Sequence, residues 1–198
     1  MITLPEALHV SRETQDRLEA FVALLEKWNP RINLVSSRDI ANVWERHVLD
    51  SLQLAPLVAG HERFIDMGSG GGFPGIVVAI ASGVPGTLIE SDRRKATFLR
   101  EAARATQAPV TVLAERIELV DIPAAPVVTA RALASLNKLL EWTESLLEKG
   151  GKAFFLKGQQ ADEELTEARR NWHMDVCLHR SITSHDGVIL EVSNLDRV

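Results

Sequence analysis

Polar and apolar positions alternate with the period of an α-helix through the N-terminal part of the chain. The spacing predicts one helix over residues 11–28, with Ser11 as its N-cap and Asn29-Pro30 as its stop. A second helix is expected to begin after Asp39, which would cap it, and to reach about Leu54. The apolar face of the first helix is formed by Leu18, Phe21, Val22, Leu25 and Trp28.

From residue 63 onward, short apolar runs alternate with stretches of helical periodicity. This alternation predicts an α/β fold with a doubly wound, Rossmann-like sheet that is mostly parallel and carries helices on both faces. The last two strands are too close in sequence for a crossover helix, so they are expected to form an antiparallel hairpin at one edge. Residues 61–198 would form a cofactor-binding domain, and residues 1–60 an N-terminal helical extension. The predicted strands are Arg63–Met67, Thr87–Glu90, Val110–Leu113, Val127–Thr129, Lys152–Lys157, Val176–Arg180 and Val188–Val192. The predicted helices are Pro74–Ala81, Arg94–Thr106, Leu136–Leu147, which Gly150-Gly151 would end, and Asp162–Asn171.

The first strand of this domain runs into a glycine-dense turn and then into a helix. Five of the eight residues from Gly68 to Gly75 are glycine, and Pro74 suits a first helical turn. Glycine is needed where the backbone adopts positive φ or approaches a ligand closely. A helix that starts behind such a turn presents free N–H groups and the positive end of its dipole to a ligand. We therefore expect a cofactor to bind at residues 62–75.

Two cofactors are compatible with this turn. The pattern from Gly70 to Gly75, with Glu90 twenty residues after Gly70, matches the fingerprint of a dinucleotide site. Asp66 precedes the glycines, however, and would repel a pyrophosphate, whereas the sulfonium and ammonium groups of S-adenosylmethionine would be attracted. Glu90 would accept hydrogen bonds from ribose hydroxyls in either case. The final hairpin also favours a methyltransferase, and a nicotinamide-dependent oxidoreductase is the alternative.

Composition narrows the class of protein further. The net charge of −5 neither supports nor excludes a nucleic-acid partner, because basic residues gather at Arg93-Arg94-Lys95. The single cysteine, Cys177, excludes an internal disulfide. The N-terminus lacks the layout of a signal peptide, and no apolar run approaches the roughly 18 residues of a membrane span. These features predict a cytoplasmic monomer without a membrane partner. His173, His179 and His185 lack metal-ligand spacing, so we expect no metal and assign structural roles to them and a packing role to Cys177.

Six short segments within about residues 25–160 carry a specific combination of polar and glycine residues. They are Asn33-Leu34, Arg46-His47-x-x-Asp50-Ser51, Asp66–Gly75, Arg94-Lys95-x-x-Phe98-Leu99, Arg131-Ala132-x-Ala134-Ser135-Leu136 and Leu156-Lys157-Gly158. In order and spacing, these segments resemble the glucose-inhibited division protein B family of small-subunit ribosomal RNA guanine-N7 methyltransferases. The resemblance implies a class I methyltransferase fold, S-adenosylmethionine as cofactor, and methylation of a specific guanine in small-subunit (16S) ribosomal RNA. The partner would be that RNA or the small ribosomal subunit.

The resemblance also implies roles for individual residues. Gly68 and Phe73 would line the S-adenosylmethionine site, and Ile117-Glu118 would border the adenine. Arg131 would touch the cofactor region. Two positions depart from the family pattern, because Glu90 stands where relatives usually carry aspartate and Phe73 where they often carry leucine. The predicted cofactor-binding residues are Asp66, Gly68, Gly70, Phe73, Glu90, Ile117, Glu118 and Arg131.

Methylation of guanine N7 requires no general base, because N7 carries a lone pair and no proton. Catalysis would then come from approach geometry and electrostatics. The sequence agrees, since it shows no evident Ser/His/Asp set, cysteine pair or Asn/Asp-Pro-Pro-Tyr/Phe signature of amine methyltransferases. Arg131 and Lys157 follow strands at the ligand edge of the sheet, where they would position cofactor, phosphate or guanine.

The predicted RNA contacts have alternatives. Arg46 and Asp50 are four residues apart on a predicted helix and would also suit an ion pair, with His47 packed between helices. The Arg93-Arg94-Lys95 cluster would also suit a solvated helix start. For the whole chain, the alternatives are methylation of another RNA or a small molecule, the oxidoreductase, and a non-catalytic RNA-binding module. The predicted RNA-binding residues are Arg46, His47, Arg93, Arg94, Lys95 and Lys157.

Overall fold

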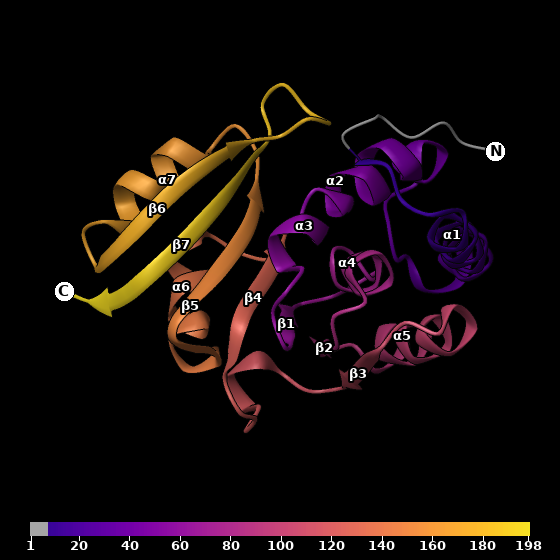
Figure 1. The fold of residues 1–198 in the computed structure, drawn as a ribbon, viewed down its shortest axis with the longest axis horizontal. Helices are drawn as coiled ribbons and strands as arrows, with labels where there is room; N and C mark the ends of the chain where they lie inside the picture. Colours follow the sequence, from indigo (N-terminus) through magenta and orange to yellow (C-terminus); the bar gives the residue numbers. More distant parts are fainter. Residues whose placement is uncertain (1–7) are drawn as a thin grey trace.

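A computed structural model of the chain describes residues 8–198. The expectation about a signal peptide concerns residues 1–6, which lie outside that range. The strands are β1 (Phe64–Met67), β2 (Gly86–Ile89), β3 (Val110–Leu113), β4 (Ala125–Arg131), β5 (Leu147–Lys157), β6 (Trp172–Arg180) and β7 (Val188–Arg197). They form one sheet in the order β3-β2-β1-β4-β5-β7-β6, in which β1 to β5 are parallel and β7 is antiparallel to both of its neighbours (Figure 1). The predicted doubly wound sheet with an antiparallel C-terminal hairpin is confirmed.

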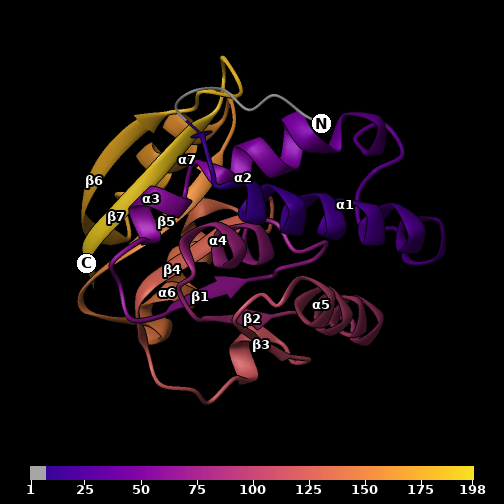
Figure 2. The same ribbon diagram turned by 45° about the vertical axis from the view of Figure 1, so that its right-hand side comes forward.

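Helices cover both faces of the sheet (Figure 2). One face carries α1 (Arg12–Ile32), α2 (Asp50–Leu52), α3 (Ala55–Val58), α4 (Gly75–Ser82) and α5 (Arg93–Thr106). The other face carries α6 (Leu136–Leu146), α7 (Ala161–Ala168) and the short 3-10 helix η4 (Ile117–Leu119). Within residues 8–198, no helix combines the length and the apolar character that a membrane span requires.

The helices before the first strand share a hydrophobic core with the helices of the sheet. Phe21 of α1 is fully buried and packs against Phe73 and Phe98, with ring centroids 5.3 and 6.2 Å from its own. Burial of such apolar surface stabilises the fold in proportion to its area. The described part of the N-terminal extension is thus packed against the rest of the protein. The domain boundary near residue 60 stays a prediction.

The predicted stop of the first helix at Asn29-Pro30 is wrong, because α1 continues to Ile32. Pro30 lacks an N–H and so removes one hydrogen bond, but only the last two residues of the helix follow it. The helix ends where Asn33 adopts the left-handed conformation, at φ +49°. The Asn29 side chain then accepts hydrogen bonds from the backbone N–H groups of Leu34 and Val35, which fixes the exit of the chain.

The second helical stretch is irregular. It begins as a 3-10 helix, η2 (Ile40–Asn42), becomes a π-helix, η3 (Trp44–Leu49), and continues into α2. Asp39 does not cap it, because its carboxylate pairs with Arg46 at 2.9 Å. Arg46 pairs with Asp39, and Asp50 pairs with Arg131. The alternative of an ion pair between Arg46 and Asp50 is therefore also wrong.

Helix α6 passes directly into strand β5. Leu147 already has extended backbone angles, and Gly150-Gly151 lie inside the strand rather than ending the helix as predicted. A Cβ on Gly151 would lie 2.8 Å from the carbonyl oxygen of Pro126. The register between β4 and β5 shifts between the residues that flank Pro126. The glycine thus accommodates an irregularity of the sheet, where the two backbones approach closely.

Candidate functional site

Two cavities open at the carboxyl ends of the parallel strands, the edge at which open α/β sheets bind ligands. The glycine-loop cavity, of about 550 Å³, lies over the turn that follows β1. The hairpin cavity, of about 990 Å³, lies between the ends of β4 and β5 and the loop that joins β6 to β7. Arg131, Ala132 and Leu133 line both cavities. The two cavities therefore adjoin at this segment.

The turn after β1 has the backbone that the glycine pattern predicts. Gly68 adopts φ +64° and Gly70 φ +52°, values that side chains with a Cβ rarely adopt. The N–H of Gly70 donates to Oε2 of Glu90 at 2.8 Å, and the N–H of Asp92 donates to Oε1 at 2.7 Å. Each carboxylate oxygen retains acceptor capacity. Glu90 therefore ties the turn to the end of β2 and can still accept hydrogen bonds from a ligand in the cavity.

Asp66 lies beneath the turn and not in the cavity. Side chains alternate along a strand, and Asp66 points to the face covered by α4, where a Cβ on Gly75 would lie 2.6 Å from its Oδ2. Thr129 donates to its Oδ1 at 2.7 Å. Complete burial raises the pKa of Asp66 to about 6, although hydrogen bonds such as that from Thr129 oppose the shift. Asp66 therefore does not line the glycine-loop cavity, and its carboxylate lies below the glycine turn.

Arg131, the last residue of β4, joins the sheet to the N-terminal helices. Its Nε pairs with Oδ2 of Asp50 at 2.9 Å. One of its terminal nitrogens donates to Nδ1 of His47 at 2.6 Å, and the other donates to the backbone carbonyl of Arg46. Burial lowers the pKa of Arg131, and the charge of Asp50 opposes that shift. These contacts fix the guanidinium at the junction of the two cavities.

His47 serves this arrangement as a neutral imidazole. Its ring stacks on Phe73, with centroids 5.0 Å apart and planes inclined by 27°. Because Arg131 only donates hydrogen bonds, Nδ1 of His47 must accept, and the proton resides on Nε2. Burial and, to a lesser extent, the charge of Arg131 lower the pKa of His47 to about 4. His47 therefore positions Arg131 and Phe73 at neutral pH without contributing charge.

Lys157 ends β5 on the floor of the hairpin cavity. Its ammonium donates to the backbone carbonyl of Ala134 and to Oε2 of Glu164, both at 2.8 Å. The same carboxylate accepts the N–H of Leu136 at the start of α6. An ammonium has three hydrogens, so one donor is left for a ligand. Lys157 is thus held rigidly and lines the cavity.

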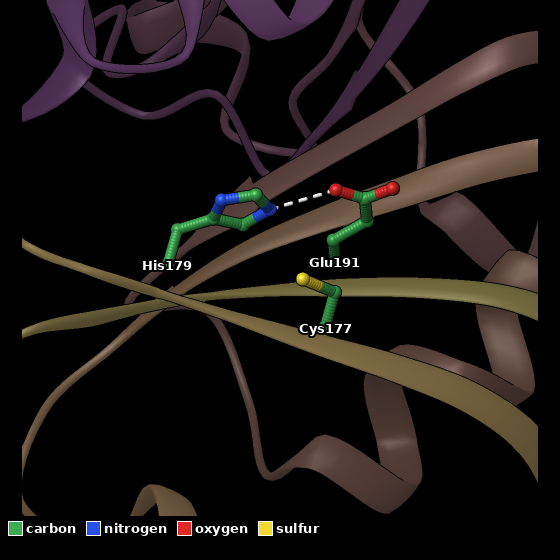
Figure 3. Close-up of side chains that lie close together, drawn as sticks. All are labelled: Cys177, His179 and Glu191. Atoms are coloured by element: carbon green, nitrogen blue, oxygen red, sulfur yellow. Dashed lines mark hydrogen bonds and ion pairs between the residues drawn. The ribbon is translucent and has the colours of Figure 1, made fainter.

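One cluster of potential metal ligands lies elsewhere, on the C-terminal hairpin (Figure 3). Among residues 8–198, the ligand atoms of Cys177, His179 and Glu191 lie within 4.8 Å of one another. His179 contacts one oxygen of Glu191 at 2.7 Å, and Lys152 pairs with the other at 2.6 Å. The ammonium of Lys152 would repel a metal ion bound here, so the cluster is best described as an ion-pair network. Cys177 is exposed, so the packing role expected for it is wrong.

Comparison with known proteins identifies the family. A sequence model of the GidB family, rRNA small subunit methyltransferase G, matches residues 14–192. A relative from Gluconobacter oxydans, ribosomal RNA small subunit methyltransferase G, is 57% identical over 96% of this chain and 98% of its own length. A relative of the same name from Paramagnetospirillum magneticum is 47% identical over 95% of this chain and 92% of its own length. The chain belongs to the rRNA small subunit methyltransferase G family.

Solved structures at low sequence identity confirm the fold of this methyltransferase G family member. The glycopeptide N-methyltransferase MtfA, in complex with S-adenosylmethionine, superimposes with a TM-score of 0.64 at 10% identity, over 74% of this chain and 93% of that one. The cofactor-bound protein Rv0187 superimposes with a TM-score of 0.60 at 18% identity, over 89% of each chain. The predicted class I methyltransferase architecture is thereby confirmed.

The structure of this methyltransferase G family member brings most of the predicted site residues together. Lys157 and Arg46 line the hairpin cavity, whereas His47 and Lys95 line the glycine-loop cavity. Arg93 and Arg94 line neither and are exposed at the start of α5. The predicted cofactor residues that line the glycine-loop cavity are Gly68, Gly70, Phe73, Glu90, Ile117, Glu118 and Arg131.

Leu133 and Trp142 are among the lining residues that sequence reasoning missed. Leu133 lies over Gly68, and a Cβ on that glycine would lie 2.4 Å from Cδ1 of Leu133. Trp142 of α6 also lines the glycine-loop cavity, and its Nε1 is buried without a hydrogen-bond partner among the described residues. Both come from segments after β4. Leu133 lies in the loop before α6 and Trp142 lies within α6, and nothing in the sequence pattern marks either as part of a ligand site.

Proposed function

We propose that the chain transfers a methyl group from S-adenosylmethionine to N7 of a guanine in small-subunit ribosomal RNA. The observation that carries this proposal is the junction of two cavities at Arg131–Leu133, in a chain that belongs to the methyltransferase G family. Methyl transfer requires a donor site and an acceptor site that open onto each other. The two cavities adjoin at the lining residues that they share, Arg131, Ala132 and Leu133.

We place S-adenosylmethionine in the glycine-loop cavity, whose volume is within the range of small-ligand sites. Glu90 would accept the ribose hydroxyls through the acceptor capacity that its two backbone contacts leave. Gly68 leaves room for Leu133 to close over the turn, and Ile117-Glu118 would border the adenine. When bound, the cofactor supplies an electrophilic methyl group on a sulfonium. The buried charge of Asp66 would complement that cation through the turn rather than by contact.

We place the target guanine in the hairpin cavity. Its N7 lone pair would form the new bond to the methyl carbon as the bond from that carbon to sulfur breaks, and sulfur keeps the bonding electrons. No proton has to be removed. Arg131 has five N–H donors, of which three are engaged, so two are left to donate to guanine O6 or a phosphate. Lys157 would donate from the other side of the cavity, and donors held rigidly in this way favour reaction by orientation.

RNA contacts outside the cavities would come from exposed basic side chains. Arg46, whose side chain is 66% exposed, lies at the rim of the hairpin cavity. Arg93, Arg94 and Lys95 lie at the start of α5, where Asp92 caps the helix and pairs with Arg94. Such contacts would bind the RNA backbone without reading its sequence. The target guanine would have to be unpaired or splayed out of a helix to enter the cavity.

The proposed substrate also bears on where the protein acts and on how its chain is organised. We infer a cytoplasmic monomer, because ribosomal RNA is processed in the cytoplasm and both cavities are built from one chain. We also retain the proposal that residues 61–198 form the S-adenosylmethionine-binding domain and residues 1–60 its helical extension. In that arrangement the extension contributes His47 and Asp50, which hold Arg131.

The test is methyl transfer from labelled S-adenosylmethionine to small ribosomal subunits and to their stripped RNA, both from cells that lack this protein. Label in 7-methylguanosine at one site is the expected result, and the better substrate shows which assembly state is recognised. Labelling at another atom would contradict the N7 assignment. Binding of S-adenosylmethionine without transfer to either substrate would reject the RNA and favour a small-molecule acceptor. Binding of NADH in its place would favour the oxidoreductase.

A further inference from the structure

Gln53 lies where the N-terminal helices meet the loop between β6 and β7. Its side chain is buried, and none of the roles described so far uses it. Its amide oxygen accepts the N–H of Ile182 at 2.8 Å. Its amide nitrogen lies within 3.3 Å of four oxygen atoms, two on Asp50 and one each on Ser181 and Thr183. That nitrogen carries two hydrogens, so it can donate to Asp50 and to the loop at the same time. Gln53 therefore connects the helix and the loop.

The carboxylate of Asp50 divides its two oxygens between this network and Arg131. Oδ1 accepts from the hydroxyl of Thr183 at 3.0 Å and faces the Gln53 amide at 3.2 Å. Oδ2 pairs with Nε of Arg131 at 2.9 Å. Charge-assisted hydrogen bonds of this kind are strong and directional. The orientation of Asp50 therefore sets the orientation of the Arg131 guanidinium.

The loop that Gln53 holds is also a wall of the hairpin cavity. Ser181, Thr183, Ser184 and Gly187 all line that cavity. Gln53 itself lines neither cavity, so any influence on bound molecules passes through its neighbours.

We propose that Gln53 is a positioning residue for the acceptor site. Through Asp50 it holds Arg131 at the junction of the two cavities, and through Ile182 it docks the loop over residues 181–187 as the outer wall of the hairpin cavity. The kinetic consequence rests on the proposed function, whereas the structural consequence for Arg131 does not.

A second glutamine provides a matched control. Gln159 also reaches this loop, and its amide nitrogen donates to Asp186 at 2.8 Å on the exposed side. Removing the Gln159 amide loosens a loop contact and leaves Asp50 untouched. Removing the Gln53 amide loosens the loop and releases Asp50. If Gln53 only fastened the loop to the helices, removal of either amide would change the surroundings of Arg131 to the same extent.

The experiment compares Gln53→Met, Gln159→Met and Thr183→Val in the full chain. The first readout is the ¹⁵N–¹H signal of the Arg131 Nε–H group, assigned by its loss in Arg131→Lys. We expect this signal to shift and to exchange faster with water in Gln53→Met, to change in the same direction in Thr183→Val, and to stay unchanged in Gln159→Met. Thr183→Val is nearly isosteric, so it carries the test if Gln53→Met fails to fold.

The second readout is methyl transfer to stripped small-subunit RNA. We expect kcat/KM for RNA to fall about ten-fold or more in Gln53→Met, with unchanged affinity for S-adenosylhomocysteine, because a displaced Arg131 affects the acceptor and not the donor. An Arg131 signal that is unchanged in both Gln53→Met and Thr183→Val would overturn the inference, and so would an equal change in Gln159→Met. If the unaltered protein methylates no RNA, the proposed function fails, and the Arg131 signal still tests the role of Gln53.

Discussion

Leu133 closes over Gly68 so tightly that a Cβ on residue 68 would lie 2.4 Å from Cδ1 of the leucine. The leucine belongs to the segment after β4 and the glycine to the turn after β1, and both line the glycine-loop cavity. A side chain at position 68 would therefore compete with Leu133 for the space at the boundary of the two cavities.

Gly68→Val should abolish binding of S-adenosylmethionine. The valine would force a β-branched residue to φ +64° and would displace Leu133 into the cavity. Calorimetric titration with S-adenosylhomocysteine measures the loss. Gly83→Val is the matched control, since Gly83 ends α4 at φ +72° with open space around it, and it should reduce stability without affecting affinity. Undiminished binding by Gly68→Val would reject the assigned cofactor site.

Arg131→Ala should reduce turnover far more than it reduces folding stability. Loss of a positioned donor at the reacting atoms typically lowers kcat by about 100-fold. Asp50 loses its charged partner but keeps the hydroxyl of Thr183, so we expect the free energy of unfolding to fall by only about 1–2 kcal/mol. Single-turnover methylation and urea unfolding measure the two effects, with the exposed Arg104→Ala as the neutral control. Turnover that falls only in proportion to the fraction of unfolded protein would assign Arg131 a structural role.

Asp66 should make the protein less stable as the pH rises from about 4 to about 6. Its pKa is raised from the usual 3.8 to about 6 in the folded state, so in this interval the folded protein binds more protons than the unfolded chain. The contribution to the free energy of unfolding therefore decreases with pH, by about 3 kcal/mol in total. Urea unfolding of Asp66→Asn at several pH values should lack this decrease. A variant whose pH dependence equals that of the unaltered protein would contradict the raised pKa.

Trp142 should report binding of the cofactor by fluorescence. Its ring lines the glycine-loop cavity, whereas Trp28 packs against Phe98 in the core, with centroids 5.8 Å apart. Quenching by S-adenosylhomocysteine should disappear in Trp142→Phe and persist in Trp28→Phe. Quenching that survives in Trp142→Phe would show that the ligand binds away from this wall of the cavity.

The regular alternation of short apolar runs with stretches of helical periodicity made most of the fold predictable from the sequence. The glycine spacing predicted a turn in which Gly68 and Gly70 have positive φ, and the position of Glu90 predicted a carboxylate beside that turn. Asp66 was predicted less well, because its place at the end of a strand suggested contact with the ligand. The alternation of side chains along β1 instead turns it toward α4.

Other features depend on pairings that no local pattern encodes. Cys177 and Glu191 come together only because the register of β6 and β7 pairs them directly. Gln53 meets Thr183 across 130 residues of chain, at a contact set by where the hairpin loop falls on the N-terminal helices. The functional consequences of such contacts become visible only in three dimensions.

The π-helix at Trp44–Leu49 gives the site a dependence on helix geometry rather than on residue identity. In an α-helix each residue advances the direction of the side chains by about 100°. The wider turn of a π-helix advances it less per residue. If the same residues were wound as an α-helix, Asp50 and Gln53 would rotate together by roughly 100°. Both side chains would then turn away from Arg131 and from the hairpin loop, although no residue of either network had been exchanged. The wider turn of the π-helix thus aligns the two halves of the site.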